Sequence, residues 1–306
     1  MTVERVVVGV DFSESSLACA RWVAAHIARG AELVLVHVLH VSEPPALLRP
    51  LYDPPDRLVE TARTGAEHQL REMSRAVATG LVWTEVREGR PEEELARVAS
   101  EYGARLVAVG AHGHHEGGLR QALGTTADRV LRRSVVPVLV AKGAMSDAPR
   151  KLLVAIDDSA ETGAVLRWTR WLAERFGASV TAMHVVSPGR ILPPDFLAMG
   201  GTGQSAAVYE ASEAAVRSAT ERWIGTRLEE SGLGDRASVA VVIGAPSDRV
   251  LEEASARGAD LIVMGSGRPG LVRRTVLGSV AESVIRDADR PVLVVPPDPS
   301  GEGESS

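Results

Sequence analysis

Two short segments of this 306-residue chain place an aspartate directly after a run of apolar residues, with a serine two positions later. The first segment, RVVVGVDFSES, contains Asp11 and Ser13, and the second, KLLVAIDDSAE, contains Asp157 and Ser159. A carboxylate at the end of a strand can bind a polar ligand, and it can also cap the helix that follows. Both interpretations remain open for each aspartate.

Two glycine-rich segments, each after a later apolar run, could bind phosphate. One begins at Gly110 and reads GAHGHHEGGLRQALGTTAD, and the other begins at Gly265 and reads GSGRPGLVRRTVLGSVAE. Glycine allows backbone N–H groups to approach a phosphate without obstruction by Cβ, and a helix N-terminus adds further donors and the positive end of a dipole. A plain turn with the same composition is the alternative.

A hydroxyl residue follows the last glycine of each segment, namely Thr125 in the first and Ser279 in the second. Three positions later stand Asp128 and Glu282, so both pairs resemble helix capping boxes. A hydroxyl at this place can serve only as a cap or can also contact a phosphate.

These features occur twice because the chain contains a duplication. Asp157 follows Asp11 by 146 positions (157 − 11 = 146), and Arg167-Trp168 follows Arg21-Trp22 at the same offset. Gly265 follows Gly110 by 155 positions (265 − 110 = 155). One domain present in two copies, with small insertions in its loops, explains these offsets, whereas a short-period solenoid does not.

Each copy alternates short β-branched runs with Ala/Arg/Glu-rich stretches of helical periodicity. In the first copy the apolar runs are Val6–Val10, Leu33–Val38, Val82–Val86, Leu106–Val109 and Val136–Val140. Nearly continuous apolar runs are typical of strands buried on both faces of a parallel sheet, joined by right-handed helical crossovers. The sequence therefore predicts an α/β protein with two tandem Rossmann-like domains, each an open five-stranded parallel sheet. We expect domains at 1–142 and 151–296, a linker at 143–150 and a disordered tail at 297–306.

Composition excludes several classes of protein. Lys and Arg total 34 against 40 for Asp and Glu, a formal charge of −6, so no basic excess indicates nucleic acid. The single cysteine, Cys19, excludes a disulfide framework and a zinc-finger array. No apolar run approaches 18 residues and the N-terminus lacks a signal-peptide pattern, so we expect a cytoplasmic protein without a membrane span.

Several further residues have structural interpretations. We expect Cys19, Trp22 and Trp168 to lie in the core, and His37 and His184 to be packed or partly buried. The acidic run Glu92–Glu94 is interpreted as a solvated helix face.

The combined motifs resemble the universal stress protein family, from about Val3 to Lys142 and from about Arg150 to Pro296. They are Val-Gly-Val-Asp-x-Ser at the start, Gly-x-Pro before the third helix, and Gly-x2-Gly-x9-Gly-(Ser/Thr) after the fourth strand. The resemblance implies an ATP site in which the aspartate and a valine ending strand two lie by adenine and ribose, and the glycines and hydroxyl lie by the phosphates. Carried over, these positions are Asp11, Val38, Gly110, Gly113, Gly124 and Thr125 in the first copy, and Asp157, Val185, Gly265, Gly267, Gly278 and Ser279 in the second.

Both copies depart from the family pattern. Ten residues rather than nine separate Gly113 from Gly124, and Arg268 occupies the place of the second glycine in the other copy, where Gly267 is one position early. A shift of one residue moves an N–H group by about 3 Å, which is the length of a hydrogen bond. Either site could therefore be weakened or empty.

Two competing motifs are rejected on their position. The segment 265–270 formally matches GxGxxG, but the NAD fingerprint follows the first strand rather than the fourth. His112, His114 and His115 lack a nearby Cys or carboxylate pair to complete a metal site, so we interpret them as an exposed loop.

The leading hypothesis is an ATP-binding stress-response or regulatory protein, with Mg or Mn on the phosphates of the nucleotide. The first alternative is a dimeric scaffold that binds no nucleotide, and the second is a slow ATPase or nucleotidyl transferase. No residue is assigned a catalytic role, because no general base or nucleophile is evident. The apolar segments Pro137–Ala141 and Pro291–Val295 are expected to pair the two domains within the chain, and a homodimer is also expected.

Overall fold

The computed structural model describes residues 1–40, 55–77, 80–111, 124–143, 145, 147–191, 203–267 and 276–298. These residues form two compact units, of which the first takes in Met1–Asp147 and also Asp289–Val294. Several residues discussed above lie outside the described part of the chain: Gly113, the three loop histidines, Arg268 and the last eight residues of the tail.

The five strands of the first copy form a parallel sheet. They are β1 (Arg5–Gly9), β2 (Glu32–Leu39), β3 (Val82–Glu88), β4 (Leu106–Gly110) and β5 (Val138–Ala141), in the order β3-β2-β1-β4-β5. The central strands are fully buried at their apolar residues, as the Val-rich runs predict.

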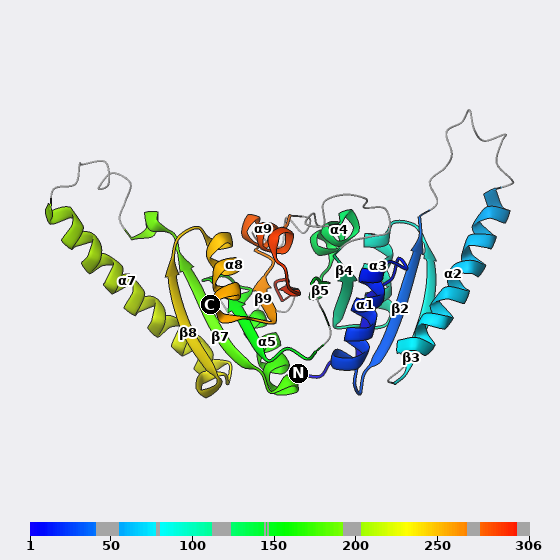
Figure 1. Cartoon of the computed structure of the whole chain (residues 1–306), viewed down its shortest axis with the longest axis horizontal. Coiled ribbons are helices and arrows are strands. Elements are labelled where there is room, and N and C mark those ends of the chain that lie inside the picture. The colour runs from blue at the N-terminus through cyan, green and yellow to red at the C-terminus, as the bar shows by residue number, and fades with distance from the viewer. Residues whose placement is uncertain are drawn as a thin grey trace, which may run out of the picture. The chain divides into compact units, whose positions relative to one another are not determined.

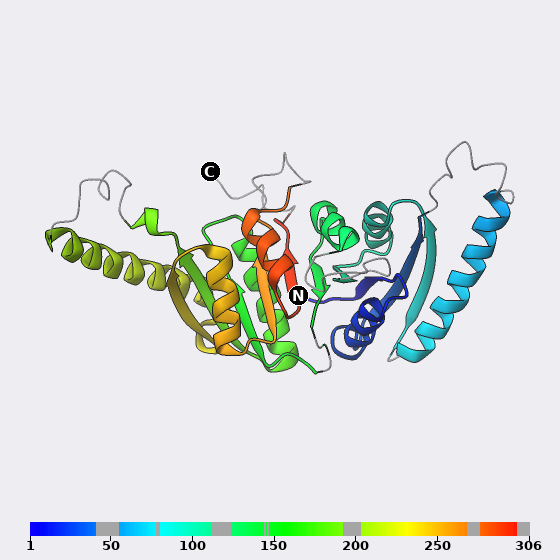
Figure 2. The ribbon, with the colours of Figure 1, turned by 45° about the horizontal axis from the view of Figure 1, so that its top comes forward.

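Helices cover both faces of this sheet. They are α1 (Glu14–Trp22), which continues as a π-helical turn at Val23–Ile27, α2 (Pro55–Val77), α3 (Pro91–Glu101) and α4 (Thr125–Arg133). α1 and α2 pack together on one side of the strands, and α3 packs with α4 (Figures 1 and 2). The arrangement is the doubly wound one that alternation of strands and helices predicts.

The second unit repeats this plan. Its strands are β6 (Lys151–Ala155), β7 (Ser179–Val186), β8 (Ala237–Ile243) and β9 (Leu261–Gly265), in the parallel order β9-β6-β7-β8. Its helices are α5 (Thr162–Phe176), α7 (Gly203–Glu230), α8 (Pro246–Arg257) and α9 (Ser279–Asp287), with short 3₁₀ turns at Pro188–Arg190 and Gly234–Arg236.

Strand β10 (Val292–Val295) belongs to the second copy by sequence, yet most of it is part of the first unit. It pairs antiparallel with β5, with Leu293 opposite Leu139. Both leucines are buried, so the two apolar strands protect each other's edges. This pairing confirms the expected association of the two segments within the chain.

The core residues follow the sequence-based expectations with one exception. Cys19, Trp22 and Trp168 are buried, and burial raises the pKa of the Cys19 thiol to about 12, which makes it unreactive. Glu92 and Glu94, interpreted above as solvated, are instead 4% and 6% exposed. Both lie in the first turn of α3, where the helix dipole favours carboxylates, and Glu94 forms an ion pair with Arg97 at 3.1 Å.

Candidate functional site

The strand order creates a switch point in each unit. In the first, the chain leaves β1 toward β2 and β3 on one side and later returns to β4 and β5 on the other. The carboxyl ends of β1 and β4 are therefore neighbours with their connections running in opposite directions, which is where open α/β sheets bind ligands. In the second unit β6 and β9 have the same relation.

Asp11 lies at this point and holds the start of α1. Its Oδ1 accepts hydrogen bonds from the Ser13 N–H at 3.0 Å and from the Ser13 hydroxyl at 2.6 Å. Ser13 is the N-cap residue, and its Oγ accepts from the Ser16 N–H at 3.2 Å. Asp11 thus orients the cap rather than capping the helix itself, and its side chain remains half-buried at the carboxyl edge of the sheet.

Phe12 stores backbone strain beside Asp11. Its φ of +64° is the one positive φ among the described non-glycine residues, and the left-handed region is unfavourable for an aromatic side chain. Its ring lies 4.5 Å from the ring of His37 between centroids. Such strain is typical of loops at functional sites.

A histidine in the second strand of each copy supports the same loop. His37 Nδ1 lies 2.8 Å from the carbonyl oxygen of Val10, and His184 Nδ1 lies 2.8 Å from that of Ile156. A carbonyl only accepts, so Nδ1 carries the proton in both. Burial lowers the pKa of His37, although the Val10 carbonyl and the Asp11 charge oppose this effect. Both histidines are half-buried, which confirms their structural interpretation.

Gly110 allows α1 to approach the end of β4. A Cβ at this position would lie 2.7 Å from Ser15 Oγ and 3.0 Å from Ser16 N. The end of β4 and the first turn of α1 therefore share one small region with Asp11. A backbone hydrogen bond joins the two ends of the loop that follows Gly110: the Gly124 N–H donates to the Ala111 carbonyl at 2.8 Å. That bond brings the start of α4 to the carboxyl end of β4.

The second copy closes its loop in the same way. Gly278 N–H donates to the Ser266 carbonyl at 2.9 Å, and a Cβ on Gly278 would lie 2.8 Å from the Gly267 carbonyl oxygen. Gly267 has a φ of +63°, which glycine adopts without strain. The glycines at both ends of this loop are thus required by a close backbone contact.

The prediction of capping boxes at the starts of α4 and α9 is wrong. The N-cap of α4 is Gly124 and that of α9 is Gly278, and glycine has no side chain with which to cap. Ser279 is instead the first helical residue and is exposed. The side chain of Thr125, the first residue of α4, lies outside the described part of the chain. First-turn N–H groups of both helices consequently lack a side-chain acceptor from the N-cap.

The remaining positions carried over from the family lie at the same edge. Val38 and Val185 are half-buried near the carboxyl ends of β2 and β7, and Asp157 follows β6 with an exposed side chain. The described residues of the predicted set thus lie near the ends of the first, second and fourth strands or at the start of the last helix of each copy, and Gly113 is outside the described part of the chain.

Sequence reasoning missed Glu161, which reaches into the second loop. This carboxylate is 3% exposed and accepts from the Ser266 hydroxyl at 2.6 Å and from the Gly267 N–H at 2.8 Å. The offset of 146 aligns Glu161 with Ser15 (161 − 15 = 146). A carboxylate in the second copy at the position of a hydroxyl in the first was the signal in the sequence that could have identified this residue.

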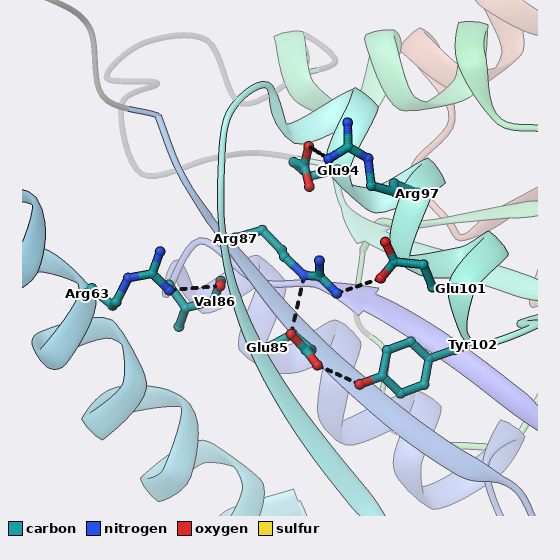
Figure 3. Close-up of polar contacts among 8 residues, drawn as sticks. All are labelled: Arg63, Glu85, Val86, Arg87, Glu94, Arg97, Glu101 and Tyr102. Atoms are coloured by element: carbon teal, nitrogen blue, oxygen red, sulfur yellow. Dashed lines mark hydrogen bonds and ion pairs between the residues drawn. The ribbon is translucent and has the colours of Figure 1, made fainter.

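A second polar cluster joins β3 to the end of α3 (Figure 3). Arg87 forms ion pairs with Glu85 at 3.2 Å and Glu101 at 2.6 Å, and the Tyr102 hydroxyl donates to Glu85 at 2.5 Å. The hydrogen bond to the Glu85 carboxylate, together with burial, raises the pKa of Tyr102. The cluster fastens an edge strand to a helix and includes none of the loop residues.

Among the residues that the structure describes, no group of three or more His, Cys, Asp or Glu side chains could hold a metal ion. The described helices also include none that is long and apolar enough to cross a membrane.

Comparison with known proteins identifies the repeated unit. The model of the universal stress protein family matches residues 2–142 and, a second time, residues 149–296. The chain belongs to the universal stress protein family. Each copy of the duplication is thus one universal stress protein domain, and the chain is a tandem member.

Some relatives match both domains of the chain, and others match about half of it. A universal stress protein of Mycolicibacterium smegmatis is 29% identical over 305 residues, which cover 95% of this chain and 97% of the relative. A crystal structure of a universal stress protein from Archaeoglobus fulgidus matches 96% of both chains with a TM-score of 0.69 at 21% identity, a likeness of fold. A universal stress protein solved in complex with cAMP covers 49% of this chain and 98% of its own, at 24% identity and a TM-score of 0.35.

Proposed function

We propose that this universal stress protein is a cytoplasmic regulatory protein that binds ATP at the glycine-rich loop after the fourth strand, with Mg or Mn on the phosphates. One observation carries the proposal. The loop closes through Gly124 N–H and the Ala111 carbonyl, which sets the N-terminus of α4 at the carboxyl end of β4, next to β1 at the switch point of the sheet. This geometry offers backbone donors and a positive dipole end to an anion.

The parts of the site suit different parts of the nucleotide. The half-buried Asp11 follows β1, and the half-buried Val38 lies near the end of the neighbouring β2. Asp11 would supply a carboxylate for ribose hydroxyls, and Val38 an apolar surface for a base. The first turn of α4 supplies main-chain donors for phosphates. Gly124 closes the loop at the start of that turn, and Gly110 keeps the end of β4 close to α1. No described side chain in this arrangement is placed as a general base, so the proposal is binding without rapid turnover.

Nucleotide carried by the freshly purified protein tests the proposal. The protein is denatured, and the released nucleotide is identified by chromatography and mass spectrometry per mole of chain, followed by titration of the stripped protein with Mg-ATP. We expect bound ATP and a loss of affinity of at least about tenfold in Gly124→Val. Gly124 is buried, so a branched side chain there displaces the loop from the helix N-terminus.

Gly80→Val is the matched control, because Gly80 is exposed and precedes β3 at the opposite edge of the sheet. It should retain wild-type affinity. A protein that carries no nucleotide and binds none on titration would overturn the proposal, and the scaffold function would then take its place.

A further inference from the structure

The second glycine-rich loop already holds an anion that belongs to the chain. Glu161 accepts from the Gly267 N–H at 2.8 Å and from the Ser266 hydroxyl at 2.6 Å, and only 3% of the residue is exposed. The two donors are 105 and 106 positions away in sequence, so this is a tertiary contact. A buried carboxylate of this kind is stable because both donors satisfy it.

The loop is shaped to receive this side chain. A Cβ on Gly265 would lie 2.3 Å from Glu161 Oε2 and 3.3 Å from Glu161 Cβ, so the carboxylate occupies the space that a larger residue would fill. Glu161 is also the N-cap residue of α5, yet its side chain makes no capping bond to that helix. The carboxylate is directed to the loop between β9 and α9 instead.

The donors that hold Glu161 are of the type that binds phosphate. The N–H of Gly267, a glycine in the left-handed region, and the Ser266 hydroxyl together provide the kind of donor set that anions prefer. A phosphate oxygen at the Gly267 N–H would have to replace the carboxylate or lie beside its charge in a poorly solvated place.

The first copy lacks both the carboxylate and the hydroxyl that donates to it. At the offset of 155, Ala111 is aligned with Ser266 (266 − 155 = 111). Ser15 is aligned with Glu161. Its hydroxyl lies close to Gly110, because a Cβ added to Gly110 would be 2.7 Å from Ser15 Oγ. The place occupied by a negative charge in the second copy is therefore occupied by a neutral group in the first. One backbone hydrogen bond corresponds in the described residues of the two copies: Gly124 N–H to the Ala111 carbonyl, and Gly278 N–H to the Ser266 carbonyl.

We infer that Glu161 acts as a built-in substitute for phosphate, so that the second loop excludes nucleotide and the chain binds a single ATP, in its first domain. This inference rests on the proposed function. Glu161 is then the residue that decides which of the two domains accepts the ligand.

Exchange of the two residues tests the inference. Mg-ATP is titrated calorimetrically into the stripped wild type, Glu161→Ser and Ser15→Glu, with thermal unfolding to check that each variant is folded. We expect about one site per chain in the wild type, about two in Glu161→Ser and none in Ser15→Glu. Glu161→Gln, which keeps the shape and removes the charge, is used if Glu161→Ser does not fold, and it should also admit a second nucleotide.

The Gly267 amide resonance of labelled protein reports on the second loop alone. In the wild type it should not respond to ATP, and in Glu161→Ser it should shift on titration. Two sites in the wild type, or an ATP-dependent shift of Gly267 there, would overturn the inference and leave the proposed function intact. A single site in both Glu161→Ser and Glu161→Gln would likewise overturn only the inference. No binding by any of the proteins would overturn the proposed function as well.

Discussion

Because Gly110 has no Cβ, two segments of the chain can lie in close contact at this residue. The end of β4 and the first turn of α1 approach so closely that a Cβ on Gly110 would lie 2.7 Å from Ser15 Oγ and 3.0 Å from the Ser16 nitrogen. The serine hydroxyl can turn away, but the backbone nitrogen cannot move without shifting the helix. The need for glycine here is thus steric rather than a requirement of φ.

Gly110→Ala is expected to lower the free energy of unfolding by about 1–3 kcal/mol, because overpacking forces the first turn of α1 outward. Chemical denaturation of the nucleotide-free protein measures the change. Gly65→Ala is the control, since Gly65 is exposed within α2 and an added Cβ meets nothing within 4 Å. This control should gain about 0.5–1 kcal/mol from helix propensity. A free energy of unfolding in Gly110→Ala equal to or above that of the wild type would contradict the close packing.

The starts of the helices differ between elements that look alike in sequence. α1 begins with a side-chain cap, because Ser13 Oγ accepts from the Ser16 N–H at 3.2 Å. α9 begins after Gly278 with Ser279 as its first residue. A hydroxyl residue near a helix start therefore caps one helix, whereas the other helix starts without a side-chain cap.

Ser13→Ala is expected to destabilise the nucleotide-free protein by about 1 kcal/mol, because a backbone donor and the Asp11 carboxylate both lose a partner. Ser279→Ala should change stability by less than about 0.5 kcal/mol, since Ser279 is exposed and is not the cap. Thermal unfolding of the two variants compares them directly. Equal losses in both would mean that Ser279 does cap α9.

Strand β10 shows that the compact units do not follow the boundaries of the repeat. The first unit contains Asp289–Val294 because β10 pairs with β5, with Val292 opposite Val140 and Leu293 opposite Leu139. The pair buries four-residue apolar strands that would otherwise expose unpaired edges.

Leu139→Lys is expected to cost about 3 kcal/mol or more, because it removes a buried side chain and places a charge in an apolar region. Hydrogen exchange of the β10 amides should also accelerate. Val135→Lys is the control, since Val135 is 55% exposed just before the same strand, and its effect should stay within about 0.5 kcal/mol. Unchanged stability and exchange in Leu139→Lys would argue that the pairing does not form in solution.

Much of the fold could be predicted from the sequence because its determinants are local or repeated. Continuous apolar runs such as Val6–Val10 specify buried parallel strands, and the regular alternation with helical stretches specifies the doubly wound class. The duplication then places Asp11 and Asp157, and the glycines after the fourth strands, at equivalent edges. Each of these inferences needs only composition and spacing within a short segment.

Only the tertiary structure decided which side chain contacts the loop after β9. Glu161 is 106 positions from Gly267, and its carboxylate can reach that N–H only after β6 and β9 have paired side by side. The burial of Glu92 and Glu94 and the choice of Gly278 over Ser279 as a cap likewise depend on packing between distant segments. Local pattern specifies which elements form, whereas the direction of each side chain follows from the neighbours that the completed sheet brings to it.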